Sequence, residues 1–256
     1  MPSHLFCFGF GFSAGALAGR CLHRGWRVSG TNRSAARNGE RQASGAMLYG
    51  FGGDAAEGAA SEELKAALAD ADHLLISIPP AAAGDPVLAA FGELIAAHRG
   101  LSWVGYLSTT GVYGNHDGAW VTEDSELRPT SDRSRRRQAA DAAWRARWRQ
   151  AACPVHIFRL AGIYGPGRNA LESVLHGKAK RIDVPGQVFG RIHVEDIAQV
   201  LEASIAKPNP GRIYNVSDDE PASPAEVIAY ACELLTVAPP PLQPMASAEL
   251  SPMARS

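Results

Sequence analysis

A glycine-rich turn near the start of the chain has the residue spacing that a bound diphosphate requires. The segment Gly9-Phe10-Gly11-Phe12-Ser13-Ala14 separates a short apolar run from a helical pattern. In such a turn the first glycine permits a tight bend, the second lets the backbone approach a pyrophosphate, and the small third residue allows close helix packing. The helix that follows offers free N–H groups and the positive end of its dipole. We therefore predict a dinucleotide site, against the alternative of a turn that serves packing only, and assign to the cofactor Gly9, Gly11, Phe12, Ser13 and Ala14.

The end of the second apolar run indicates which dinucleotide is preferred. Sites for NAD usually carry Asp or Glu there, which binds the ribose 2′-hydroxyl. This chain has Gly30-Thr31-Asn32-Arg33-Ser34 instead, with no acidic residue. Arg33 can pair with a 2′-phosphate, and Thr31 or Ser34 can donate hydrogen bonds to it. We expect NADP(H) to be preferred over NAD(H), with a solvated loop arginine as the alternative, and assign to the cofactor Thr31, Asn32, Arg33 and Ser34.

The elements that must position this turn alternate between short apolar strands and helical patterns. We predict strands over residues 4–8, 26–29, 46–49, 73–78, 102–107 and 154–160, and helices over residues 13–24, 34–44, 61–69, 86–98, 132–151, 195–206 and 224–235. Ile78 and Pro79 end the fourth strand, where the adenosine half of a cofactor would pass. Asp54 follows the third strand and is a candidate adenine contact or a simple turn residue.

The order of these elements predicts the fold class. Strands that alternate with helices and are apolar throughout indicate βαβ units and a parallel sheet covered on both faces. We therefore expect an α/β fold, a Rossmann-type doubly wound parallel sheet with a small C-terminal substrate lobe. Residues 1–160 would form the dinucleotide-binding core, and residues 161–256 a mixed α/β lobe that also supplies the remaining elements of the sheet.

Charge and cysteine content argue against several classes of partner. The formal net charge of -1 gives no global field for nucleic acid or an anionic membrane, and no stretch approaches the ~20 apolar residues of a membrane span. The four cysteines show no CxxC spacing and no histidine pair has metal-ligand spacing, so we expect reduced thiols and no metal. The start of the chain lacks the charged region of a signal peptide. We expect a cytoplasmic protein without nucleic-acid or membrane partners.

Four segments of the chain together resemble a known family. They are residues 9–14, Leu107-Ser108-Thr109-Thr110-Gly111-Val112-Tyr113-Gly114, Phe158-Arg159-Leu160-Ala161-Gly162-Ile163-Tyr164-Gly165-Pro166-Gly167-Arg168, and Arg191-Ile192-His193-Val194-Glu195-Asp196-Ile197-Ala198. In this order they are similar to the extended short-chain dehydrogenases/reductases of the NAD-dependent epimerase/dehydratase type, over residues 5–235. Within that superfamily the chain looks closest to the atypical, nucleoside-diphosphate-sugar epimerase-like branch.

The resemblance implies catalysis by a serine or threonine, a tyrosine and a lysine, the last two spaced Tyr-x-x-x-Lys on one helix. Thr109 matches the Ser/Thr position, and Ser108 lies beside it. The tyrosine and lysine positions hold Arg133 and Arg137, and a guanidinium that stays protonated cannot serve as an ordinary acid or base. Arg137 could still bind the ribose or a phosphate of the cofactor. Tyr164 is a further catalytic candidate, with a packing role as its alternative.

Cations in the second half of the chain predict an anionic, small-molecule substrate. Arg168 follows a glycine/proline loop that, by the resemblance, borders the substrate, and His193 could titrate near neutrality. Arg133 and Arg137 lie four residues apart, so both could point into the cleft. The substrate-binding residues expected are thus Arg133, Arg168 and His193. As the alternative, the arginine-rich helix 132–151 packs its tryptophans and solvates its arginines, and by the resemblance it could form a homodimer interface.

Two functions follow from this sequence. The first is an NADP(H)-dependent oxidoreductase or sugar-nucleotide-modifying enzyme with an altered Tyr-x-x-x-Lys. The second is a non-catalytic dinucleotide-binding redox sensor or regulator. The motifs of the substrate lobe favour the first function, whereas the missing tyrosine and lysine favour the second.

Overall fold

A central sheet organises the computed structural model, which describes residues 2–33, 40–41, 45–52 and 61–244. Its strand order is β11-β7-β6-β5-β1-β2-β4-β3, and each neighbouring pair is parallel except β3 with β4. The strands are β1 (His4–Phe8), β2 (Arg27–Asn32), β3 (Glu40–Arg41), β4 (Met47–Gly50), β5 (His73–Ile76), β6 (Trp103–Thr109), β7 (Val155–Leu160) and β11 (Ile213–Val216). This topology confirms the predicted Rossmann-type α/β fold.

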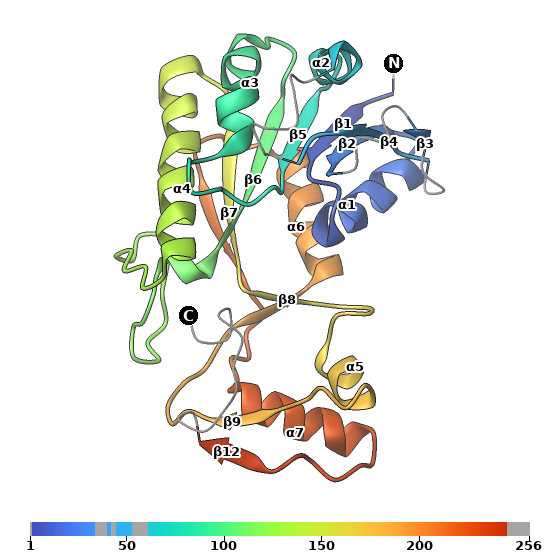
Figure 1. The fold of residues 1–256 in the computed structure, drawn as a ribbon. Helices are drawn as coiled ribbons and strands as arrows, with labels where there is room; N and C mark the ends of the chain where they lie inside the picture. The colour runs from blue at the N-terminus through green and yellow to red at the C-terminus, as the bar shows by residue number, and fades with distance from the viewer. Residues whose placement is uncertain (1, 34–39, 42–44, 53–60, 245–256) are drawn as a thin grey trace.

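Helices cover both faces of the sheet (Figure 1). One face packs against α1 (Phe12–His23) and α6 (Val194–Ala206), and the other against α2 (Glu62–Ala69), α3 (Pro86–Ala97) and α4 (Asp132–Ala151). The alternation along β1 shows why both faces are apolar, since Leu5 and Cys7 join the first core whereas Phe6 and Phe8 join the second. All four cysteines are buried free thiols.

The chain between β2 and β4 differs from its prediction. A helix was expected over residues 34–44, but Glu40–Arg41 form the short edge strand β3, antiparallel to β4. Residues 34–39 and 42–44, Ser34 included, lie outside the described residues. The segment 34–44 carries no leucine, isoleucine, valine or aromatic residue, so a helix there would have no apolar stripe to pack on the sheet.

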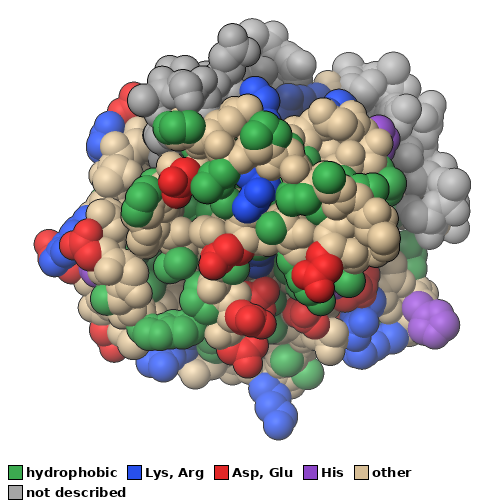
Figure 2. All heavy atoms as spheres, turned by 90° about the horizontal axis from the view of Figure 1, so that it is seen from below, with side chains coloured by type: hydrophobic (Ala, Val, Ile, Leu, Met, Phe, Trp, Pro, Cys, Tyr) green, Lys and Arg blue, Asp and Glu red, His purple; other side chains and the backbone are tan. Residues whose placement is uncertain are grey.

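A second lobe lies beyond the carboxyl ends of the parallel strands (Figure 1). It contains β8 (Gly162–Tyr164) paired with β10 (Arg191–His193), β9 (Arg181–Asp183) paired with β12 (Leu242–Pro244), and the helices α5 (Ala170–Leu175) and α7 (Pro224–Leu234). Seen from below, the described surface mixes hydrophobic, acidic and basic side chains (Figure 2). The chain returns from this lobe to form α6, which packs on one face of the main sheet, and β11, a strand of that sheet. No helix of the described part is long and apolar enough to cross a membrane.

Candidate functional site

The glycine turn after β1 adopts a conformation that other residues rarely reach. Gly9 has φ of +87°, and a Cβ at this position would lie 2.9 Å from Cγ1 and 3.1 Å from the backbone nitrogen of Ile78. Ile78 is buried directly against the turn, whereas Pro79 is exposed beside it. Glycine at position 9 therefore lets the chain turn sharply while the segment after β5 packs against it.

Thr31 of β2 holds this turn from inside the protein. Its side chain is fully buried, and its Oγ1 accepts a hydrogen bond of 2.9 Å from the Gly9 N–H. The Thr31 carbonyl accepts a second bond of 2.7 Å from the Phe10 N–H. The expected direct contact of Thr31 with a cofactor phosphate does not fit this placement, because no surface of the side chain is open to a ligand. Thr31 instead positions the turn.

The N-terminus of α1 is open to an anion. Gly11 is its N-cap and supplies no side-chain hydrogen bond, and the first turn contains no acidic residue. A Cβ built on Gly11 would meet no atom within 4 Å. Ser13 and Ala14 are buried, so they present the helix backbone rather than their side chains. Free N–H groups at a positive dipole end and an unobstructed approach are the requirements for phosphate binding.

The carboxyl end of β2 presents its polar residues close to this turn. Asn32 is half-buried and its carbonyl accepts a hydrogen bond of 2.8 Å from the Phe51 N–H. Arg33 follows the strand and is exposed. The described end of β2 carries no acidic side chain, while Ser34 and Asp54 lie outside the described residues.

The carboxyl end of β6 places Thr109 at the same edge of the sheet. Its Oγ1 accepts a hydrogen bond of 3.1 Å from the Gly111 N–H, which caps the short 3-10 helix Thr110–Val112. Accepting this bond leaves the hydroxyl hydrogen of Thr109 free to donate to a ligand. Ser108, its neighbour, is buried and faces Asp141 of α4.

Helix α4 places its two predicted site arginines, Arg133 and Arg137, in different surroundings. The Arg137 guanidinium donates hydrogen bonds of 3.0 Å to the Tyr106 hydroxyl and 2.9 Å to the Leu107 carbonyl. It is thereby bound to β6 through Nη1, while the expected ribose or phosphate contact would use the remaining N–H donors of the guanidinium. Arg133 is exposed at the start of the helix and does not line the cavity of the second lobe. Neither tyrosine nor lysine occurs in α4, and Trp144 is buried, as its packing alternative predicted.

A buried polar network behind Thr109 was not anticipated from the sequence. Arg159 of β7 pairs with Asp141 at 3.1 Å, both side chains being at most 3% exposed, and donates to the Tyr113 hydroxyl at 2.8 Å. Tyr113 in turn donates to Asn215 at 2.7 Å. Burial raises the pKa of Asp141, although Ser108 and Arg159 oppose that shift. The available signal was an arginine within β7, whose other residues are apolar except His156, because a buried charge requires a partner.

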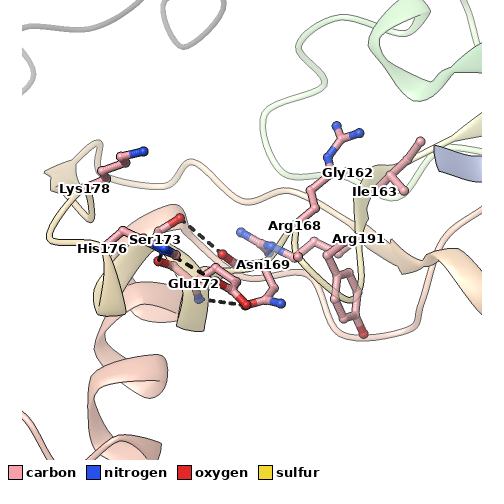
Figure 3. Close-up of a pocket in the computed structure, with 11 residues that line it drawn as sticks. Gly162, Ile163, Arg168, Asn169, Glu172, Ser173, His176, Lys178 and Arg191 are labelled. Carbon is pink, nitrogen blue, oxygen red and sulfur yellow. Dashed lines mark hydrogen bonds and ion pairs between the residues drawn. The ribbon is translucent and has the colours of Figure 1, made fainter. Parts of the chain in front are cut away.

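A cavity of about 610 Å³ opens where β8 meets α5 (Figure 3). Its lining includes Tyr164 and the basic side chains of Arg168, His176, Lys178 and Arg191, with Glu172 as the acidic member. Such a lining is suited to an anionic ligand.

Two of the predicted residues, Tyr164 and His193, lie side by side, and Tyr164 lines this cavity. Tyr164 and His193 are paired across β8 and β10, with their rings edge to face at 5.2 Å, although His193 itself caps α6 through a 3.3 Å bond from the Glu195 N–H. Arg191 in the same ladder donates 3.0 Å bonds to the carbonyls of Phe189 and Ala222, and burial lowers the pKa of its guanidinium. The structure therefore groups Tyr164 with cations, while Arg133 stands apart.

Comparison with known proteins places this architecture in a family. The family model described as "NAD dependent epimerase/dehydratase family" matches residues 88–217. Protein YeeZ of Escherichia coli K12 is 30% identical over 242 residues, which cover 91% of this chain and 84% of YeeZ.

Solved structures show the same fold. A functionally unknown conserved protein from Silicibacter pomeroyi has a TM-score of 0.86 and 48% identity, over 99% of this chain and 85% of that one. UDP-glucuronic acid 4-epimerase from Bacillus cereus, in complex with UDP-glucuronic acid and NAD, has a TM-score of 0.74 and 18% identity, over 94% and 85%. With its fold, its glycine turn and these matches, the chain belongs to the NAD-dependent epimerase/dehydratase family.

Proposed function

We propose that this protein binds NADP(H) at the glycine turn and acts as an oxidoreductase or sugar-nucleotide-modifying enzyme on an anionic small molecule in the cavity of the second lobe. One observation carries the proposal: the uncapped N-terminus of α1 lies next to the loop that borders the cation-lined cavity, since Gly165 packs on the Phe12 ring. A cofactor and a substrate could therefore meet at this edge of the sheet. The bound UDP-glucuronic acid of the Bacillus cereus epimerase is an anion of the kind proposed.

The preference for NADP(H) rests on the end of β2. Arg33 is exposed there and could pair with a 2′-phosphate, and no described residue at this strand end would accept a hydrogen bond from a 2′-hydroxyl as a carboxylate does. Titration of the protein with NADPH and NADH should show tighter binding of NADPH. Arg33→Ala should weaken NADPH binding by about 10-fold to 100-fold, the value of a charge-assisted hydrogen bond, and change NADH binding little. Tighter binding of NADH by the wild-type protein would refute the preference.

The chemistry would use groups other than the usual tyrosine and lysine. Thr109 has a hydroxyl hydrogen free for a substrate oxygen, and the Tyr164 phenol faces the cavity beside Arg191. We assign Thr109 to substrate orientation and Tyr164 to proton transfer. A screen of NADPH oxidation with carbonyl compounds and carboxylated nucleotide sugars tests the assignment. Thr109→Ala and Tyr164→Phe should each reduce turnover at least tenfold, and unchanged turnover in both would overturn it.

A non-catalytic dinucleotide-binding regulator is the second candidate. It is favoured by Arg137, whose guanidinium is engaged by Tyr106 and Leu107 where the family pattern has a lysine. Tight NADPH binding without turnover of any compound in the screen would select this function. A homodimer formed through α4 is compatible with either function. Measuring the molecular mass of the protein in solution tests whether it is a dimer.

A further inference from the structure

The loop after β8 is a hydrogen-bonded turn that packs on Phe12, the first residue of α1. Gly165 and Arg168 exchange two backbone hydrogen bonds of 3.0 Å, and the Asn169 side chain donates a third, of 2.9 Å, to the Gly165 carbonyl. A Cβ at Gly165 would lie 2.7 Å from Val194 and 3.1 Å from the Phe12 ring. The glycine thus allows the turn to press against the N-terminal ends of both α1 and α6.

This seating places the Arg168 guanidinium over the Phe12 ring, with Cζ at 5.8 Å from the ring centroid. The side chain is exposed, and within the described part of the chain its guanidinium makes no hydrogen bond or ion pair. A guanidinium at cation–π distance from an aromatic face keeps its edge N–H groups available for two parallel bonds to a phosphate. Phe12 belongs to the glycine turn, so these donors lie beside the place where a diphosphate would bind.

The N-terminus of α1 has no side-chain cap, so its free backbone N–H groups can bind an anion. The other described α-helices are each capped by a side chain that accepts a backbone N–H, namely Ser61, Asp85, Ser131, Asn169, His193 and Ser223. In α1 the cap is Gly11, without a side chain. Open N–H groups and an unpaired guanidinium, supplied by two different lobes, thus converge on one small region.

We infer that Arg168 binds the diphosphate of the dinucleotide from the second lobe and completes the site that the glycine turn opens. The inference rests on the proposed function, because it requires a dinucleotide at the turn. It changes the expected role of Arg168, which would bind the cofactor rather than a substrate phosphate or carboxylate.

Titration of three ligands against matched variants tests the assignment. NADPH and ADP-ribose contain a diphosphate, whereas adenosine contains no phosphate. Arg168→Ala should weaken the binding of NADPH and ADP-ribose about 10-fold to 100-fold, as expected for charge-assisted bonds, and leave the binding of adenosine unchanged. Arg168→Lys should give a smaller loss, since the ammonium keeps the charge but not the paired geometry. Lys178→Ala is the control, because Lys178 lines the same cavity at a site apart from Arg168 (Figure 3) and should leave all three affinities unchanged.

The outcomes separate this inference from the proposed function. If the wild-type protein binds NADPH and Arg168→Ala binds NADPH and ADP-ribose equally well, the inference fails while the proposed function stands. Equal losses in Arg168→Ala and Lys178→Ala would also refute it, because the effect would then be that of general charge. If the wild-type protein binds none of NADPH, NADH and ADP-ribose, the proposed function fails and the inference fails with it. Unchanged thermal unfolding of the ligand-free variants confirms that each one is folded.

Discussion

Replacing Gly9 by alanine tests whether the backbone conformation and close packing of the glycine turn require a glycine at this position. The backbone at Gly9 has φ of +87°, a region in which an L-residue with a Cβ is strained by about 1–2 kcal/mol. The added methyl group would also lie 2.9 Å from a side-chain carbon and 3.1 Å from the backbone nitrogen of Ile78. Overpacking of this kind costs about 1–3 kcal/mol, because buried Ile78 cannot move without disturbing the core. Gly9→Ala should therefore lower the free energy of unfolding by about 2–5 kcal/mol.

Gly19→Ala provides a control with the opposite sign. Gly19 lies within α1, is exposed, and has no atom within 4 Å of the position that a Cβ would take. Alanine should stabilise the helix there by about 0.5–1 kcal/mol, since glycine loses more backbone entropy on folding.

Urea unfolding followed by circular dichroism measures both changes. The midpoint should fall for Gly9→Ala and rise slightly for Gly19→Ala. If Gly9→Ala unfolds at the wild-type urea concentration, neither the strain at Gly9 nor the close approach of Ile78 is real, and the reasoning is refuted.

Two further predictions concern buried charge. Asp141→Ala would leave the Arg159 guanidinium buried without its counter-ion and should lower the free energy of unfolding by about 3–5 kcal/mol. Asp132→Ala removes an exposed ion pair with Arg135 and should lower it by less than about 1 kcal/mol. Similar urea midpoints for the two variants would contradict this account. Burial lowers the pKa of His156, whose Nε2 accepts a 2.9 Å bond from the Asn209 N–H, so the unfolded chain takes up a proton more readily than the folded one. This stabilisation is present above the pKa of the unfolded histidine, about 6.5, and is lost as the pH falls below that value. The free energy of unfolding should therefore decrease more steeply from pH 7.5 to pH 5.5 in the wild-type protein than in His156→Gln. Parallel pH profiles of the two proteins would disprove this prediction.

The sheet could be predicted from the sequence because its signals are local. Each parallel strand is a short apolar run, and Gly9 and Gly11 mark the turn between the first strand and its helix. The predicted bounds of α4 agree with the structure at both ends, where Ser131 caps the helix and the left-handed Ala152 ends it. The helix predicted over residues 34–44 is wrong at Glu40–Arg41, which pair with β4, because the segment contains helix-forming residues but no apolar face.

The site was harder to predict because side chains far apart in sequence decide it. Thr31 was expected to donate a hydrogen bond to a cofactor phosphate, yet its side chain is buried and accepts a hydrogen bond from the Gly9 N–H. The partners of Arg159 lie on α4 and in the loop after β6, so no spacing rule could identify them. The cation–π contact of Arg168 with Phe12 likewise joins two segments from different lobes.

Arg133 and Arg137 of α4 cannot donate a proton near neutrality, so a proton donor has to lie on another element. The guanidinium of Arg137 is held by the Tyr106 hydroxyl and a backbone carbonyl of β6, and burial raises the pKa of Tyr106, so this pair secures the helix to the sheet and supplies no proton near neutrality. Arg133 cannot supply one either, because a guanidinium stays protonated. A proton donor would then have to come from another element at the same edge. Among the residues predicted as catalytic, Tyr164 at the cavity is the one that we propose for proton transfer, whereas Thr109 at the end of β6 would orient the substrate and Ser108 is buried. If the protein is an enzyme, its chemistry has moved from α4 to these strand ends, and Tyr164→Phe is the substitution that would show it.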